Sequence, residues 1–173
     1  CRLSVAPHRP TPSGNSRPRN RAGKSTSPNR RDMNLHPALA QDCLVLGCFP
    51  LCRLLLMLDA NYPWFILVPD RAGVTEVHQL PAEDQQQLMH ESVILSRMLE
   101  QVFTPDKLNL AALGNVVPQL HMHHIVRYRN DPAWPDPVWG RVPRREYTLS
   151  ELTGLQEKIA QPLGAMSGFT VKQ

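Results

Sequence analysis

Apolar residues along this chain fall into short runs separated by turn-forming residues. The runs 53–58 and 64–68 are bounded by such residues and predict two adjacent strands. A second pair of strands is predicted at 108–113 and 119–128, with the Gly- and Pro-containing stretch 114–118 between them. Two pairs of neighbouring strands indicate a mainly antiparallel sheet.

A longer periodic segment follows Pro81, where apolar residues recur mostly at three- and four-residue steps. Because proline suits a first helical position, we predict that a helix of about five to six turns begins there. Thr148 and Glu151 have the spacing of a capping box and predict a last helix to about Gln161. Helices added to an antiparallel sheet predict an α+β fold with one long helix and a C-terminal helix.

The segment 132–139 holds closely spaced prolines and two tryptophans. Prolines at this density are incompatible with a helix interior and with a central strand, so we predict an irregular loop. Trp134 and Trp139 could stack on a nucleobase or could anchor this loop by burying aromatic area.

Charge is very unevenly distributed along the chain. The net charge is +4, but residues 1–32 hold eight of the 19 basic residues and only one of the 15 acidic residues. The remaining residues, 33–173, therefore carry a net charge of −3. The high isoelectric point is thus no sign of a nucleic-acid-binding surface on the folded part, and we expect none.

Residues 1–32 are rich in Arg, Pro, Ser and Asn and poor in large apolar residues, which predicts a disordered basic tail. The composition becomes that of a globular protein at Met33, so residues 33–173 are predicted to form a single domain. The preferred interpretation is that Met33 is the natural start and that the tail is upstream sequence read in frame. An organelle transit peptide and a basic arm for nucleic acid or an anionic surface remain alternatives.

The four cysteines do not form a paired Cys-x-x-Cys pattern, so we expect reduced thiols rather than a disulfide scaffold or a zinc ribbon. The longest apolar stretch, 43–69, is interrupted by Arg53 and Asp59. It leaves no window that could span a bilayer, so we predict no membrane association and a cytoplasmic location.

The predicted strand 119–128 carries three histidines. Side chains alternate between the faces of a strand, so Gln119, His121 and His123 are expected on one face and His124 on the other. A neutral imidazole is nucleophilic near pH 7, and a neighbouring imidazole can donate a proton or a hydrogen bond. A Gly-Asn turn just upstream can direct main-chain N–H groups toward an anion.

Two other interpretations of these histidines stay open at the level of residues alone. Histidines on an edge strand can be surface residues without a function. His-x-His is also a common zinc or iron pair, but no Asp, Glu or Cys falls at a suggestive spacing for a third ligand. A metal site is therefore the weaker prediction, and we expect no metal or other cofactor.

The stretch 114–127 reads Gly-Asn-Val-Val-Pro-Gln-Leu-His-Met-His-His-Ile-Val-Arg. It resembles the motif of the histidine triad (HIT) family, His-φ-His-φ-His-φ-φ after a Gly-Gln or Gly-Asn turn, with Gln119 at the first histidine position. The stretch 59–69 resembles the first nucleotide-binding hairpin of that family. The resemblance runs from about Asp42 to Gly140 and implies a HIT-like α+β fold.

The resemblance also implies a function, which is that of a nucleotidyl hydrolase or transferase. His121 would attack the α-phosphate of a nucleotide, and His123 would contact the phosphate and help the leaving group depart. Asn115 and main-chain amides beside Gly114 would hold the phosphoryl oxygens, and Asp59 would accept hydrogen bonds from the ribose. From the residues alone, Asp59 could equally be a simple turn residue.

Substrates of this kind include dinucleoside polyphosphates and nucleoside phosphoramidates, and the resemblance suggests a homodimer. The alternative function is a nucleotide-binding protein with little or no turnover. A metal-dependent enzyme is a third possibility.

The chain departs from the family pattern at three positions. Gln119 keeps hydrogen bonding but does not titrate, and Val116 lacks the hydroxyl of the Ser or Thr found in many members. Trp64 stands at the approximate place of another histidine. The resemblance therefore supports the fold and the nucleotide site more firmly than it supports a particular rate.

Overall fold

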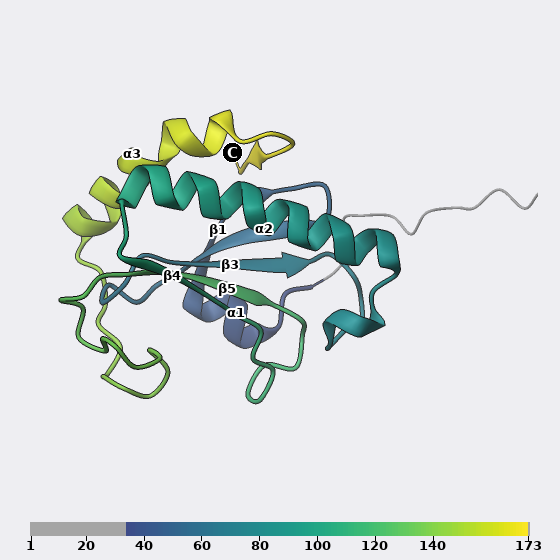
Figure 1. Ribbon diagram of the computed structural model, residues 1–173, viewed down its shortest axis with the longest axis horizontal. Coiled ribbons are helices and arrows are strands. Elements are labelled where there is room, and N and C mark those ends of the chain that lie inside the picture. The colour runs from purple at the N-terminus through teal and green to yellow at the C-terminus, as the bar shows by residue number, and fades with distance from the viewer. Residues whose placement is uncertain (1–33, 173) are drawn as a thin grey trace, which may run out of the picture.

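The computed structural model describes residues 34–172, which form an antiparallel sheet with helices on both faces (Figure 1). The strands are β1 (Cys43–Cys48), β2 (Cys52–Met57), β3 (Trp64–Pro69), β4 (Lys107–Ala111), β5 (Met122–Arg127) and β6 (Thr170–Val171). The helices are α1 (Pro37–Asp42), α2 (Ala82–Phe103) and α3 (Leu149–Ala165), with a 3-10 turn, η1, at Val77–Gln79. The α+β class predicted from the sequence is confirmed.

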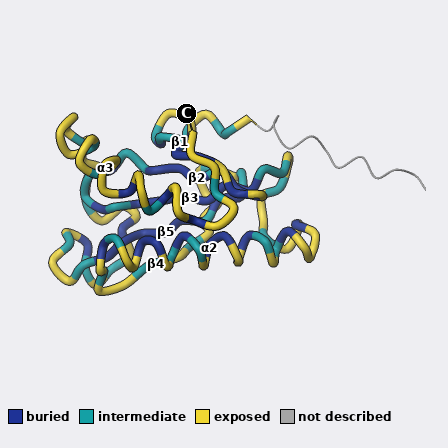
Figure 2. Tube along the Cα trace, turned by 90° about the horizontal axis from the view of Figure 1, so that it is seen from above, coloured by how far each residue is buried: buried dark blue, intermediate teal, exposed yellow. Residues whose placement is uncertain are grey.

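The strands lie in the order β4-β5-β3-β2-β1-β6, and every neighbouring pair is antiparallel. The central strand β3 is buried along its whole length, because side chains of both its faces are covered (Figure 2). Ile66 of β3 pairs with His123 of β5, and Phe65 pairs with His124. Directly paired residues share a face, so the two histidines point to opposite sides of the sheet.

One side of the sheet is covered by α2, with α3 packed beside it (Figure 1). Phe65 and Leu67 of β3 belong to this core together with Leu88, Leu95 and Leu99 of α2. The buried Glu91 of α2 accepts hydrogen bonds from the amides of Leu51 and Cys52, at 2.8 and 2.9 Å. These charge-assisted hydrogen bonds attach the helix to the turn between β1 and β2.

The other side of the sheet is covered by α1 and by the loop 128–148. Arg127, which is only 1% exposed, holds this loop in place. Its guanidinium donates to both carboxylate oxygens of Asp131, to the side chain of Asn109 and to the carbonyl of Asp136. It also lies over the ring of Trp134, 5.7 Å from the centroid, so that tryptophan anchors the loop.

The predicted elements are present, with shifted ends. The long helix occupies 82–103, and the capping box of Thr148 and Glu151 opens the last helix as expected. That helix continues to Ala165 rather than Gln161, because Leu163 and Met166 at its end pack into the core. The strands β1 and β6 and the short helix α1 were not predicted.

The predicted strand 119–128 is shorter than expected, because β5 begins only at Met122. Pairing stops near this point on both sides: β3 pairs with β5 no further than Met122, and β4 ends opposite His123. The residues before it are fixed by other contacts. The amide of Leu120 donates to the carbonyl of Val74, and the carbonyl of Gln119 accepts from the His121 ring.

The predictions for the tail 1–32 and for Cys1 lie outside the described residues. The described cysteines, Cys43, Cys48 and Cys52, are free thiols. Among the helices of residues 34–172, none is long and apolar enough to cross a membrane.

Candidate active site

A hollow of about 400 Å³ opens on the side of the sheet away from α2. Its walls come from α1, β2, the 113–117 turn, the histidine segment and the loop 128–148; the lining residues are Ala38, Leu39, Asp42, Met57, Leu113, Asn115, Val116, Val117, His121, His123 and Trp139. Most of these side chains are apolar, with a few polar groups among them, as is common for sites that bind small molecules. Three predicted site residues, Asn115, His121 and His123, therefore share one cavity.

His121 lies in the wall of this hollow and is only 5% exposed. Its Nδ1 lies 2.7 Å from the carbonyl oxygen of Gln119. A carbonyl only accepts, so Nδ1 carries a hydrogen and, in the neutral ring, Nε2 keeps its lone pair. Burial lowers the pKa of His121 from its usual value of 6.5, so the ring is neutral at pH 7.

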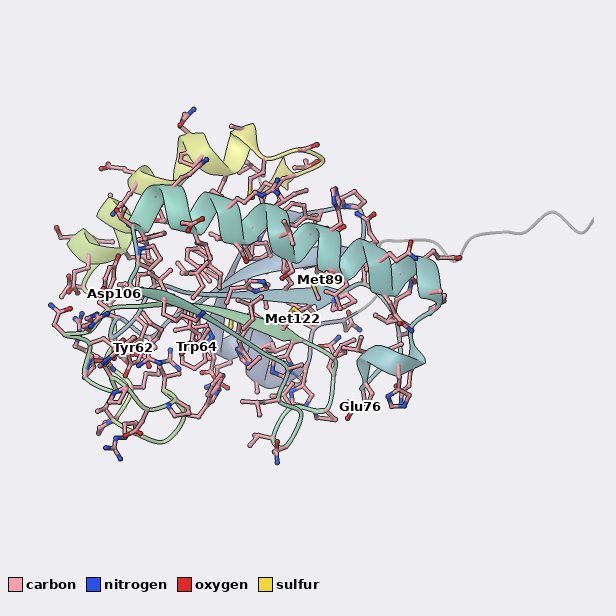
Figure 3. All side chains as sticks on the ribbon, in the orientation of Figure 1. Tyr62, Trp64, Glu76, Met89, Asp106 and Met122 are labelled. Atoms are coloured by element: carbon pink, nitrogen blue, oxygen red, sulfur yellow. The ribbon has the colours of Figure 1, made fainter. Side chains whose placement is uncertain are left out.

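His123 lies beside His121, with ring centroids 4.7 Å apart and the ring planes nearly perpendicular. Its Nδ1 accepts a hydrogen bond of 2.9 Å from the indole Nε1 of Trp64. Burial, with the neighbouring His121 and His124 as smaller causes, lowers the pKa of His123 to about 3. Figure 3 shows Trp64 on the side of the sheet away from α2, in β3.

His124 is fully buried on the opposite face and lies against α2. Its Nδ1 is 3.3 Å from the carbonyl of Met122, and its Nε2 is 2.7 Å from the hydroxyl of Ser92. The prediction that His124 lies on the face opposite to His123 is confirmed. Both ring nitrogens are used within the core.

A second, more polar hollow of about 200 Å³ adjoins the first. Leu113, Asn115 and His121 line both, and the smaller one is completed by Thr75, Glu76, Ala112, Gly114, Gln119 and Leu120. Two more predicted site residues, Gly114 and Gln119, are therefore in the smaller hollow. His121 stands at the boundary between the two hollows.

Gln119 uses its side chain to hold the segment before α1. Its Oε1 accepts from the amide of His36 at 2.8 Å, and its Nε2 donates to the carbonyl of Asn34 at 3.3 Å. Gln119 thus orients His121 through its main-chain carbonyl. Through its side-chain amide it holds residues 34–36 beside the site. A glutamine suits this role because it offers both a donor and an acceptor.

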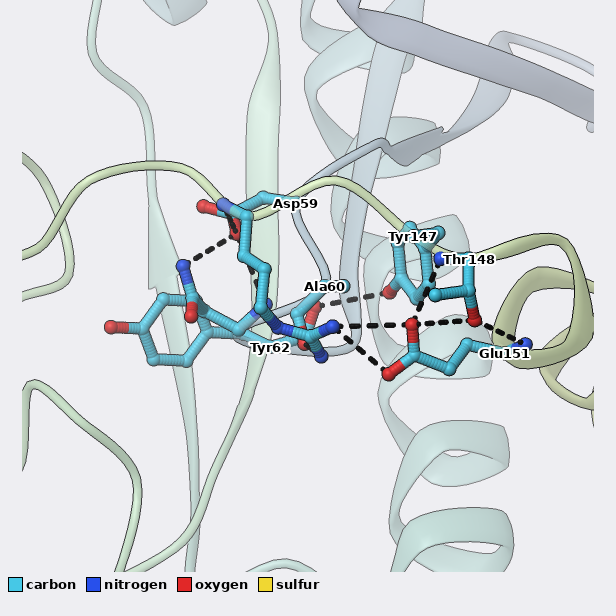
Figure 4. A network of polar contacts seen from close by, with 8 residues as sticks. Asp59, Ala60, Tyr62, Tyr147, Thr148 and Glu151 are labelled. Carbon is cyan, nitrogen blue, oxygen red and sulfur yellow. Dashed lines mark hydrogen bonds and ion pairs between the residues drawn. The ribbon is translucent and has the colours of Figure 1, made fainter.

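Asp59 is placed differently from the other predicted site residues, because it lines neither hollow. Its Oδ1 accepts from the amide and the side chain of Asn61 and from the amide of Arg145 (Figure 4). Arg145 in turn pairs with Glu151 at the start of α3. In the described residues Asp59 thus organises a turn, and its role toward a ribose stays a prediction.

Sequence reasoning missed the contribution of α1 to the site. Ala38, Leu39 and Asp42 of this helix line the larger hollow. A six-residue helix is too short to show a hydrophobic period, and the one available signal was Pro37 at its first position, preceded by His36, whose ring caps Ala38. Trp139, for which two roles were open, lines the hollow and lies 5.2 Å from the His123 ring.

Metal ligation has no support in the part of the chain that the structure describes. Residues 34–172 contain no group of three or more His, Cys, Asp and Glu side chains arranged to hold an ion. The polar residues that line the two hollows with His121 are Asp42, Asn115 and His123 in the larger and Thr75, Glu76, Asn115 and Gln119 in the smaller.

Comparisons with known proteins agree with this site. A family model described as the HIT domain matches residues 39–130. A histidine triad protein from Marinobacter aquaeolei VT8 is 48% identical, with a TM-score of 0.74, covering 78% of this chain and 98% of its own. Another, from Bradyrhizobium japonicum, is 42% identical, with a TM-score of 0.72, covering 75% and 96%.

A histidine triad (HIT) protein from Sinorhizobium meliloti 1021 is 36% identical, with a TM-score of 0.74, and covers 78% of this chain and 100% of its own. A search of curated proteins gives no match. The family model covers more than half of the chain, and the identities lie well above those of a shared fold alone. The chain belongs to the histidine triad family.

Proposed function

We propose that this protein is a nucleotidyl hydrolase or transferase in which His121 is the nucleophile. The observation that carries the proposal is the state of the His121 ring. Its Nδ1–H is bound to the Gln119 carbonyl, its Nε2 has no hydrogen-bond partner among residues 34–172, and the residue lines both hollows. A neutral, oriented imidazole with a free lone pair is what a nucleophilic histidine requires.

The proposed reaction has two steps. The Nε2 lone pair of His121 forms a bond to the α-phosphorus, while the bond from phosphorus to the leaving group breaks and its electron pair goes with that group. Water or another acceptor then attacks the same phosphorus and releases a proton to solvent, the N–P bond breaks, and the electron pair returns to Nε2. Such reactions depend on positioning and on stabilising charge that spreads over the phosphoryl oxygens.

The two hollows suit the two parts of such a substrate. The larger, mainly apolar one can take the nucleoside, and the smaller polar one can take the leaving group. Asn115, which lines both, is then placed to donate to a phosphoryl oxygen, together with main-chain amides beside Gly114. His123 would donate to the same phosphoryl group.

Two carboxylates are candidates for binding the ribose hydroxyls in this proposal. The family resemblance assigns the ribose hydroxyls to Asp59, whereas Asp42 is the carboxylate that lines the larger hollow, paired there with Arg144 at 2.7 Å. AMP titrations of Asp42→Asn and Asp59→Asn distinguish the two assignments. The residue that holds the ribose is the one whose substitution weakens binding.

The test of the function is release of AMP by the full chain in the presence of a chelator. Diadenosine tetraphosphate and an adenosine phosphoramidate are the substrates, and His121→Ala is the matched variant. Release of AMP by the unsubstituted protein alone supports the histidine nucleophile. AMP binding without turnover in both proteins would instead support the alternative, a nucleotide-binding protein.

A homodimer and a cytoplasmic location stay predictions. The homodimer is consistent with the exposed edge of β4, where Leu110 is 47% exposed, and with exposed Met89 and Val93 on α2. An exposed sheet edge with apolar side chains favours association with a second copy. Light scattering on the protein and on Leu110→Lys tests the prediction, which fails if both have the mass of one chain.

A further inference from the structure

Trp64 and His123 form a buried hydrogen bond whose direction is fixed by chemistry. The distance from the indole Nε1 to the imidazole Nδ1 is 2.9 Å, and the two residues are only 5% and 4% exposed. An indole nitrogen always donates and never accepts, so Nδ1 of His123 must accept. The one hydrogen of the neutral imidazole is therefore on Nε2.

Among residues 34–172, the groups around His123 include no unpaired negative charge that would favour its charged form. The rings of Trp64 and Trp139 pack against the His123 ring, the strand partner of His123 is the apolar Ile66, and the neighbouring His121 and His124 carry no negative charge. Asp42 of α1 lines the same hollow, but its carboxylate is paired with Arg144. A second hydrogen on Nδ1 would also point at the indole N–H, and two donors cannot share a hydrogen bond.

We propose that Trp64 is a positioning residue that holds His123 in the neutral Nε2–H form, so that His123 donates a hydrogen bond but supplies no proton. The indole rigidly excludes a hydrogen from Nδ1, and it leaves Nε2–H as the donor. The assignment of the tautomer stands on the geometry alone. Its consequence for catalysis rests on the proposed function.

The consequence concerns the leaving group. A neutral imidazole that gave up its Nε2 hydrogen would become an anion, which is inaccessible near neutral pH. His123 can therefore stabilise negative charge on a phosphoryl or leaving-group atom, but the leaving group must depart without a proton from this residue. Gln119, which does not titrate, cannot supply one either. Turnover should fall steeply as the leaving group becomes more basic.

The first test measures the tautomer and needs no substrate. Histidine ring nitrogens of the full-length protein, labelled with 15N, are followed by long-range nitrogen–proton NMR from pH 8 to pH 5. We expect His123 to show hydrogen on Nε2 only and no titration, whereas His121 shows hydrogen on Nδ1. Assignment uses His121→Ala and His124→Gln. A hydrogen on Nδ1 of His123, or a midpoint near 6.5, would overturn the proposal.

The second test removes the indole N–H. In Trp64→Phe and Trp64→His, Nδ1 of His123 no longer faces an obligatory donor, so a second tautomer and titration within this pH range should appear. Trp134→Phe is the control, because it removes an indole from the same side of the sheet but leaves the hydrogen bond to His123 in place. A His123 signal unchanged in both folded Trp64 variants shows that another group sets the tautomer, and the proposal fails.

The third test concerns catalysis and separates this proposal from the proposed function. The substrates are aryl esters of AMP whose phenolate leaving groups increase in basicity. The kcat for each ester is measured with the unsubstituted protein and with Trp64→His. We expect kcat to fall more steeply with leaving-group basicity in the unsubstituted protein than in Trp64→His. If both proteins release AMP and kcat depends equally on leaving-group basicity in both, the proposal that His123 supplies no proton is overturned, while the proposed function stands. Absence of AMP release from every protein would overturn the function and leave the NMR result to decide the tautomer.

Discussion

His121 and His124 begin from the same local geometry and end in opposite environments. Each places its Nδ1 against the carbonyl of the residue two positions earlier, at 2.7 and 3.3 Å. The Nε2 of His124 is then occupied by the Ser92 hydroxyl, whereas the Nε2 of His121 has no hydrogen-bond partner among residues 34–172 and the residue lines both hollows. The difference shows that a buried histidine is a candidate nucleophile only when its second ring nitrogen is not engaged by another group of the protein.

The largest expected effect separates the two histidines by activity. His121→Ala removes the nucleophile and should lower kcat for AMP release by about 10³-fold or more. His124→Ala should change it by no more than a few-fold, since the ring points into the core. A loss from His124→Ala as large as that from His121→Ala would break the comparison, provided that circular dichroism shows both variants folded.

Stability should separate them in the reverse order. His124→Ala opens a space between β5 and α2 and leaves Ser92 without its partner, which should cost about 2–4 kcal/mol in the free energy of unfolding. His121→Ala, at the wall of a hollow, should cost about 1 kcal/mol or less. Urea unfolding of both variants measures this. Equal losses would mean that His121 is packed as tightly as His124.

The pH dependence of stability sharpens the contrast further. Burial lowers the pKa of His124 to about 4 in the folded protein, against 6.5 for an unperturbed histidine. The unfolded chain therefore takes up a proton first, so stability is complete above pH 6.5 and is lost as the pH falls from 6.5 toward 4.

His124→Gln keeps a hydrogen-bonding group beside Ser92 but does not titrate. Between pH 6.5 and pH 5.5 it should lose about 1 kcal/mol less stability than the unsubstituted protein. His78→Gln, an exposed substitution in η1, is the control. If His124→Gln and the control show the same loss, His124 does not carry this part of the pH dependence.

The smallest effect is expected for the residue that supports His121. Gln119→Ala keeps the main-chain carbonyl that orients His121 but removes the side-chain contacts to Asn34 and His36. AMP binding should weaken a few-fold, because α1 lines the larger hollow, while kcat falls less. Calorimetric titration with AMP measures this, and unchanged binding would show that the 34–36 contacts do not matter to the hollow.

Much of the fold could be predicted because local patterns and tertiary packing agree there. The period of 82–103, the capping box at Thr148 and the apolar runs that form β2 and β3 each carry their own signal. β1 was missed because only the short turn 49–51 separates it from β2, and Pro50 within an otherwise apolar stretch was not recognised as the turn signal. β6 has only two residues, and its pairing with Gly47 and Cys48 is a purely tertiary contact.

The same division holds for the site. The stretch 114–123 is enough to predict that Asn115, His121 and His123 lie together, because their spacing is local, although His121 precedes β5 rather than lying in it. Asp59 did not join them, since three hydrogen-bond donors from its own turn and from Arg145 engage its carboxylate. The walls supplied by α1 and by Trp139 come from segments that meet the histidines only in the folded protein.

The sequence by itself determined the family, the α+β class, the histidine segment and the opposite orientation of His123 and His124. These features follow from the order of neighbouring residues, because successive side chains of an extended strand point to alternate faces of the sheet. The tertiary structure alone decided which partners the ring nitrogens of His123 and His124 find. Those partners are Trp64 from β3 and Ser92 from α2, and hydrogen-bond partners from distant segments leave no periodic signal in a chain.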